Sequence, residues 1–172
     1  YKRQEKLLTG VRDGSLDNIL FPEDVVDNIN QIITDLEETF PIQQKRYTFG
    51  IMALIGWGKP TKVTMEMGLL IEVPDPVRFA IVGIIKSVLP DEKLPLIDIK
   101  VAFLGMIDFQ EKRLSFDASI FNSRLIQYTL EGDMALRLSW GQDRGFLMSV
   151  GGFHPTFQPS ANLAVPSLRR IT

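Results

Sequence analysis

The chain has 172 residues, of which 45% are hydrophobic and 23% charged, and it contains no cysteine and one histidine. This length suffices for one domain with a core that needs no disulfide, and the lack of cysteine excludes thiolate zinc clusters and cysteine nucleophiles. The formal charge of −2 provides no long-range field to attract nucleic-acid phosphates, so we expect no nucleic-acid partner.

No apolar segment approaches the ~20 residues that a membrane-spanning helix needs, so we predict a soluble chain without a transmembrane segment. Residue 1 is tyrosine rather than methionine, and we interpret the chain as a single domain, 1–172, that is a fragment of a longer protein.

The first part of the chain reads as a lead-in, 1–21, followed by one amphipathic helix, 22–40. Pro22 suits a first helical position, and Pro41 follows the last helical residue. Between them, apolar residues recur at intervals of three and four: Val25, Ile29, Ile32, Ile33, Leu36 and Phe40. Such spacing places one apolar stripe on a helix whose other side is solvated.

The segment 46–153 changes to a period of two, which is typical of half-buried strands. In 63–73 every second residue is apolar, and the intervening side chains include lysine, threonine and glutamate. Similar alternation recurs between short turn signals, so neighbouring strands must run antiparallel. Val77 to Leu89 is apolar on both sides and fits a covered strand or a buried helix; its β-branched residues favour the strand.

These elements predict an α+β fold that is mainly β: a twisted antiparallel meander of six or seven long strands with the helix packed on one face. The stretch 154–172, rich in proline and small polar residues, reads as a linker-like tail. The predicted strands have one apolar side and one polar, solvated side. One helix is too small for the apolar side, so curvature, a second copy, the parent chain or an apolar ligand must cover the rest.

Two motifs in the last third of the domain are similar to a family of very long bacterial proteins that carry an uncharacterised conserved domain of unknown function. These motifs are GDMALRLSWG, 132–141, and SVGGFHP, 149–155. The similarity continues through 14–17, 56–58, 69–78 and 117–119. The resemblance implies a piece of a larger bacterial polypeptide and no particular activity. The compartment stays open between the bacterial cytoplasm and an extracellular assembly.

The weak catalytic candidates are His154 and the three acids Asp117, Glu131 and Asp133. His154 follows two glycines and precedes a proline, which would hold its ring in a defined direction; a hydrogen bond within a tight turn is the simpler interpretation. The acids lie on the polar sides of neighbouring predicted strands, where a hydrolase could use two of them. Arginines and lysines on the same strands favour cross-strand ion pairs on a wet face instead.

We therefore expect a non-enzymatic structural or assembly module, without cofactor or metal, whose sheet edges pair with flanking segments of the parent chain or form a homo-oligomer. The alternative is a groove on the sheet that binds or conducts lipid or another apolar ligand. Its candidate residues are Met65, Met67, Phe103, Met134 and Trp140. A hydrolase is the third hypothesis.

Overall fold

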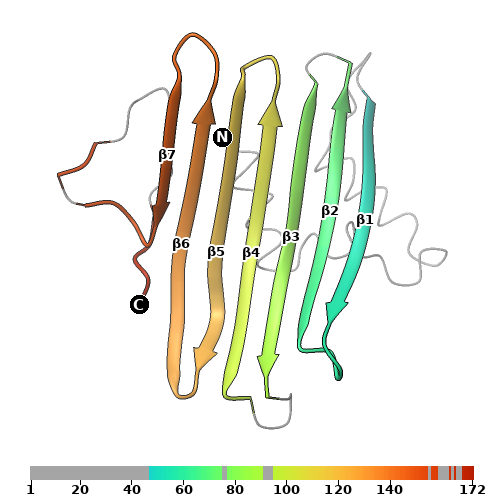
Figure 1. Cartoon of the computed structure of the whole chain (residues 1–172), viewed down its shortest axis with the longest axis vertical. Helices are drawn as coiled ribbons and strands as arrows, with labels where there is room; N and C mark the ends of the chain where they lie inside the picture. Colours follow the sequence, from blue (N-terminus) through green and yellow to red (C-terminus); the bar gives the residue numbers. More distant parts are fainter. Residues whose placement is uncertain are drawn as a thin grey trace, which may run out of the picture.

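The structure is a computed structural model and describes residues 47–74, 77–90, 95–154, 156–158, 163, 165 and 168–172. These residues form one open sheet of seven strands in the order β1 to β7 (Figure 1). The strands are β1 (Tyr47–Trp57), β2 (Val63–Val73), β3 (Arg78–Leu89), β4 (Ile97–Asp108), β5 (Arg113–Leu125), β6 (Tyr128–Ser139) and β7 (Gly145–Val150).

The antiparallel meander is confirmed, since each strand pairs antiparallel with the next along the chain. Val77 to Leu89, for which the sequence leaves strand and helix open, contains strand β3. The connections are tight: Ile126 and Gln127 alone separate β5 from β6, and Ile126 has a φ of 59°. The predicted helix, 22–40, and the lead-in, 1–21, lie outside the described residues.

The register aligns alternate residues of all seven strands on one side of the sheet, which we call face A. One row of paired residues crosses the whole sheet on this side: Ile51, Leu69, Ile81, Gly105, Phe116, Leu136 and Met148. The neighbouring row on the other side, face B, contains Met52, Gly68, Val82, Leu104, Asp117, Ala135 and Ser149. Face A of the seven strands carries no charged side chain, and the charged strand residues lie on face B.

The alternation is as predicted, but the expected solvated side is wrong in β7 and in the second half of β6. Phe146, Met148 and Val150 on face A are exposed, whereas Leu147 and Ser149 on face B are buried. The C-terminal segment accounts for this reversal. Leu163 is buried against Gly145, where a Cβ atom would lie 3.1 Å from its Cδ2 atom, so Leu163 covers this part of face B.

Two phenylalanine rings lie flat across the middle of face A, each over a glycine of the neighbouring strand. A Cβ atom on Gly83 would lie 2.8 Å from Phe103, and one on Gly105 would lie 3.1 Å from Phe116. The two rings stack with centroids 6.1 Å apart. This packing explains why Phe103 is only 5% exposed on an otherwise open face.

The C-terminal segment also forms backbone hydrogen bonds with β6, next to β7. The six residues of β7 pair with only the second half of β6, and residues 169–172 lie along the first half. Glu131 and Thr172 exchange two backbone hydrogen bonds of 3.1 Å, and the Asp133 N–H group donates to the Arg169 carbonyl at 3.2 Å. The last residues of the predicted linker-like tail are thus hydrogen-bonded to β6.

We expect Gly83→Ala to lower the free energy of unfolding by about 1–3 kcal/mol, because an added Cβ atom would lie 2.3 Å from the Glu66 carbonyl oxygen. Gly50→Ala is the matched control, since its Cβ atom would meet only Leu70 at 3.4 Å. This control should change stability by less than about 1 kcal/mol, in the stabilising direction. Urea unfolding followed by tryptophan fluorescence measures both, and equal effects would contradict the close approach of β2 and β3.

Candidate functional site

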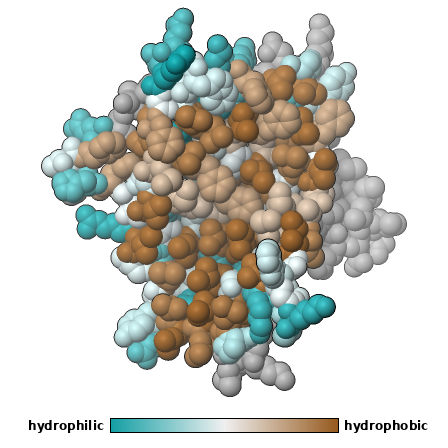
Figure 2. Space-filling view, in the orientation of Figure 1, coloured by the Kyte–Doolittle hydropathy of each residue, from teal (hydrophilic) through white to brown (hydrophobic). Residues whose placement is uncertain are grey.

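Face A is an apolar surface that extends over all seven strands, and among the described residues no segment is packed across it. Figure 2 shows hydrophobic residues gathered across it, with hydrophilic residues mainly around the rim. Six strand spacings of about 4.8 Å and strands of eleven or twelve residues give an area on the order of 1,000 Å². This area is larger than the largest apolar patch of a typical monomer, which covers about 300–600 Å².

The residues predicted to bind an apolar ligand all lie on face A. Met65 and Met67 of β2, Phe103 of β4 and Met134 of β6 all belong to face A. The three methionines are half-buried, so part of each flexible thioether side chain remains accessible. Trp140 follows β6 at one end of the face and meets Phe109 edge to face, with ring centroids 6.5 Å apart.

The β1 strand forms an edge that lacks the usual protection. Within the described residues no strand pairs with its outer side, and its eleven residues, YTFGIMALIGW, contain neither charge nor proline. All of them except Ala53 are exposed, including Ile51 on face A and Leu54 on face B. Natural edge strands are usually short, charged or bulged, because a free edge is a template for another strand. The opposite edge strand, β7, is short.

The predicted carboxylates lie on face B and are held by arginines. Arg137 Nη2 donates to Asp117 Oδ2 at 3.1 Å, while Nη1 lies 2.8 Å from Oδ1 but donates to the Leu136 carbonyl at 2.9 Å. Burial raises the pKa of the Asp117 carboxyl, and the Arg137 guanidinium offsets part of this effect. The cross-strand pair is as expected, but the expected solvation is wrong for this pair, because Arg137 is buried.

Arg169 joins the other two carboxylates to the C-terminal segment. It donates to Asp133 from Nε at 3.0 Å, from Nη2 at 2.9 Å and from its backbone N–H group at 2.9 Å. Its Nη1 donates to Glu131 at 3.0 Å, and its Nη2 also donates to the Ser119 hydroxyl at 2.8 Å. These contacts fasten the last residues of the chain to β5 and β6.

The hydrogen bonds of Asp133 control its ionisation. Burial by itself would raise the pKa of the Asp133 carboxyl, but hydrogen bonds from Arg169 and from the Ser119 hydroxyl outweigh it. The pKa of Asp133 therefore lies below its ordinary value, and the carboxylate is ionised at neutral pH.

His154 lies in the loop after β7 and is exposed. Its Nδ1 atom is 2.8 Å from the Thr156 hydroxyl and accepts the Thr156 N–H group at 3.3 Å, so its ring is held within its own turn. In the part of the chain that the structure describes, no group of three acidic or histidine side chains could hold a metal ion. No helix among those residues is long and apolar enough to cross a membrane.

The comparisons with known proteins identify a family for almost the whole chain. A family of unknown function, DUF6603, matches residues 3–172. The chain belongs to this family. Comparison with the curated proteins and with the solved structures found no match.

Sequence reasoning on the DUF6603 domain missed the role of Arg169. Its partners Asp133 and Ser119 are separated from it by 36 and 50 positions, and the proline-rich segment before it carries no strand pattern. The adjacent Arg169 and Arg170 could have indicated this contact, because cations that are partly buried against a sheet are usually paired with acidic side chains.

We expect Asp133→Asn to lower the free energy of unfolding of the DUF6603 domain by about 2 kcal/mol at neutral pH, because it removes a charged acceptor shared by Arg169 and Ser119. The folded pKa of Asp133 is depressed, so its contribution is present above the unfolded pKa and is lost as pH falls. The difference in the free energy of unfolding between wild type and variant should therefore shrink as the pH falls below roughly 4.

Glu131→Gln is the matched control, since Glu131 contacts the same arginine but is exposed. It should change the free energy of unfolding by no more than about 0.5 kcal/mol. Urea titrations of the three proteins across the acid range measure these differences. If the stability difference between wild type and Asp133→Asn stayed constant with pH, the lowered pKa of Asp133 would be contradicted.

Proposed function

We propose that the DUF6603 domain is a non-enzymatic assembly module that adds a partner strand to the free edge of β1. The observation that carries this proposal is an eleven-residue apolar edge strand without charge, proline or an outer partner among the described residues. Its N–H and C=O groups can extend the ladder to another strand, which is a common mode of protein recognition.

The two edges of the sheet differ in a way that supports this role. At the β7 side the edge strand has six residues, and residues 169–172 pair with the part of β6 that β7 leaves free. At the β1 side the described residues include no such protection. The asymmetry favours growth of the sheet in one direction, onto a second copy in the isolated chain and onto flanking segments in the longer polypeptide.

The contacts of the catalytic candidates favour this role over a hydrolase. Asp117, Glu131 and Asp133 are all bound by arginines, which hold the C-terminal segment and the β5–β6 pair. His154 contacts Thr156 in its own loop. These bonds account for the four residues as structural groups.

We expect the wild-type chain to self-associate, and Leu54→Glu or Ile51→Glu to weaken association at least about tenfold, because a charged edge strand opposes pairing. Both side chains are exposed, 69% and 61%, so neither change should unfold the sheet. Sedimentation equilibrium measures the association.

Met148→Glu on β7 is the control, since Met148 is similarly exposed, at 56%, but lies on the other edge strand. It should leave association unchanged. A wild-type chain that remains monomeric at high concentration, or variants that all behave alike, would overturn edge pairing.

The composition of face A supports a second candidate function, the binding of lipid or another apolar ligand. Its seven strands present aliphatic, aromatic and methionine side chains and no charged side chain. Its area is larger than the apolar patches that soluble monomers usually expose to water. Aliphatic chains laid on this face would lose contact with water without leaving a charge unpaired.

We expect organic extraction of the purified chain, followed by mass spectrometry, to release an apolar ligand in amounts comparable to the protein. Ile51→Glu and Met148→Glu should reduce the amount, because both place a charge on face A. Leu54→Glu, on face B of the same strand as Ile51, should retain it. A clean wild-type extract, or equal loss in all three variants, would contradict binding at face A.

A further inference from the structure

The tyrosines and tryptophans of the sheet stand at its two ends. Tyr47 and Trp57 are the first and last residues of β1, Tyr128 is the first residue of β6, and Trp140 follows the last residue of β6. By alternation and register all four belong to face A. Within the described residues these are all the tyrosines and tryptophans, and each is exposed.

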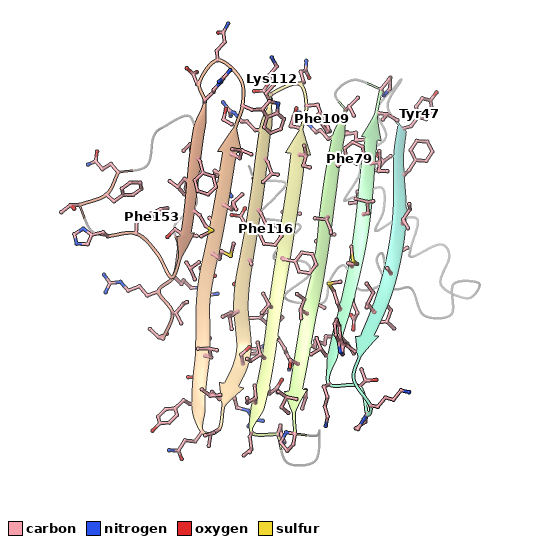
Figure 3. All side chains as sticks on the ribbon, viewed as in Figure 1. Tyr47, Phe79, Phe109, Lys112, Phe116 and Phe153 are labelled. Atoms are coloured by element: carbon pink, nitrogen blue, oxygen red, sulfur yellow. The ribbon has the colours of Figure 1, made fainter. Side chains whose placement is uncertain are left out.

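At one end the aromatic residues share a transverse row. Tyr47 pairs with Val73, and the register of β2 and β3 brings this row to Val77, which accepts the N–H group of Phe109. Phe109 begins the turn between β4 and β5, and near the end of this turn the Lys112 carbonyl accepts the N–H group of Trp140. Figure 3 labels Tyr47, Phe109 and Lys112 at this end of the sheet.

The distance between the two ends matches a layer of lipid. Tyr47 and Trp57 are ten residue steps apart along β1, which corresponds to about 34 Å, and the hydrocarbon layer of a bilayer is about 30 Å thick. The strand residues between the ends of face A are uncharged. Two acyl layers placed tail to tail therefore fit between the aromatic ends, with their headgroups beyond.

Exposed cations stand at both ends, where such headgroups would lie. Lys112 is in the β4–β5 turn beside Trp140, and Lys59 is in the β1–β2 turn, two residues after Trp57. Tyrosine and tryptophan prefer the boundary between hydrocarbon and headgroups, and a lysine beyond them can meet the phosphate.

We propose that face A binds diacyl phospholipid, with acyl chains parallel to the strands and phosphate headgroups at the aromatic and cationic ends. This inference rests on the second candidate function and names its ligand class and orientation. The aliphatic and methionine side chains of face A contact the chains, Tyr47, Trp57, Tyr128 and Trp140 mark the boundary, and Lys112 and Lys59 meet the phosphates.

The placement of the aromatic residues favours lipid over a second copy packed face to face. Energetically dominant tryptophans and tyrosines in protein interfaces cluster near the centre of the contact. On face A the centre holds Phe103 and Phe116, which are already packed over glycines, and the exposed tryptophans lie at the ends.

The two tryptophans report this orientation directly, since the sequence contains no others. The chain is incubated with phosphatidylcholine and phosphatidylglycerol vesicles whose lipids carry bromine either near the headgroup or near the chain end. We expect tryptophan fluorescence to be quenched at least about twofold more by bromine near the headgroup, because Trp57 and Trp140 sit at the boundary. Stronger quenching by bromine near the chain end would overturn the orientation.

Lys112→Gln tests the phosphate contact, with Arg113→Gln as its control. The two residues are adjacent and exposed, but Arg113 pairs with Ser139 on face B. Lys112→Gln should weaken binding to the same vesicles by about fivefold, and Arg113→Gln should leave it unchanged. Equal effects of the two variants would overturn the contact.

A neutral alkyl dye separates this inference from the function on which it rests. If the chain binds the dye but neither vesicle quenching nor the Lys112→Gln effect appears, phospholipid is excluded while apolar binding remains. Absence of both dye and vesicle binding would remove the second candidate function as well. If the chain self-associates without vesicles and this shields both tryptophans from water, face A binds a second copy and the proposal is overturned.

Discussion

The register of the six antiparallel pairings is the constraint on which this molecule depends. Because side chains alternate between the two sides of a strand, a slip of one residue in any pairing would move a whole apolar set to the other face. The row from Ile51 to Met148 crosses all seven strands without such a slip. The bulges in the pairings of β5 lie near one end and leave this row intact.

The two faces owe their different character to where the ion pairs lie. On face B, Asp117 meets Arg137 and Asp133 meets Arg169, so charges that burial would otherwise disfavour are compensated across strands and by the C-terminal segment. Face A has no charge to compensate. The polar side is thus the covered side in β7 and in the second half of β6, and the apolar side of β7 is exposed.

Much of this architecture was predictable, and the exceptions have identifiable causes. The apolar alternation around Met65, Met67 and Met134 places these residues on one face, since a short-range period of two determines orientation within each strand. Arg169 and its partners were not predictable, because their contacts join positions far apart in the chain and no local period reports them. The burial of Phe103 was likewise hidden, since it depends on Gly83 of the next strand.

By itself, the sequence determined the strands, their antiparallel order and which residues share a side. Alternation and short turns are local properties, and local interactions are sufficient to specify them. Only the tertiary structure decided which side is covered, which strands form the edges among the described residues and which carboxylates are bound. Those outcomes depend on where the C-terminal segment returns and on the cumulative register of seven strands, and neither is encoded in any single stretch of the chain.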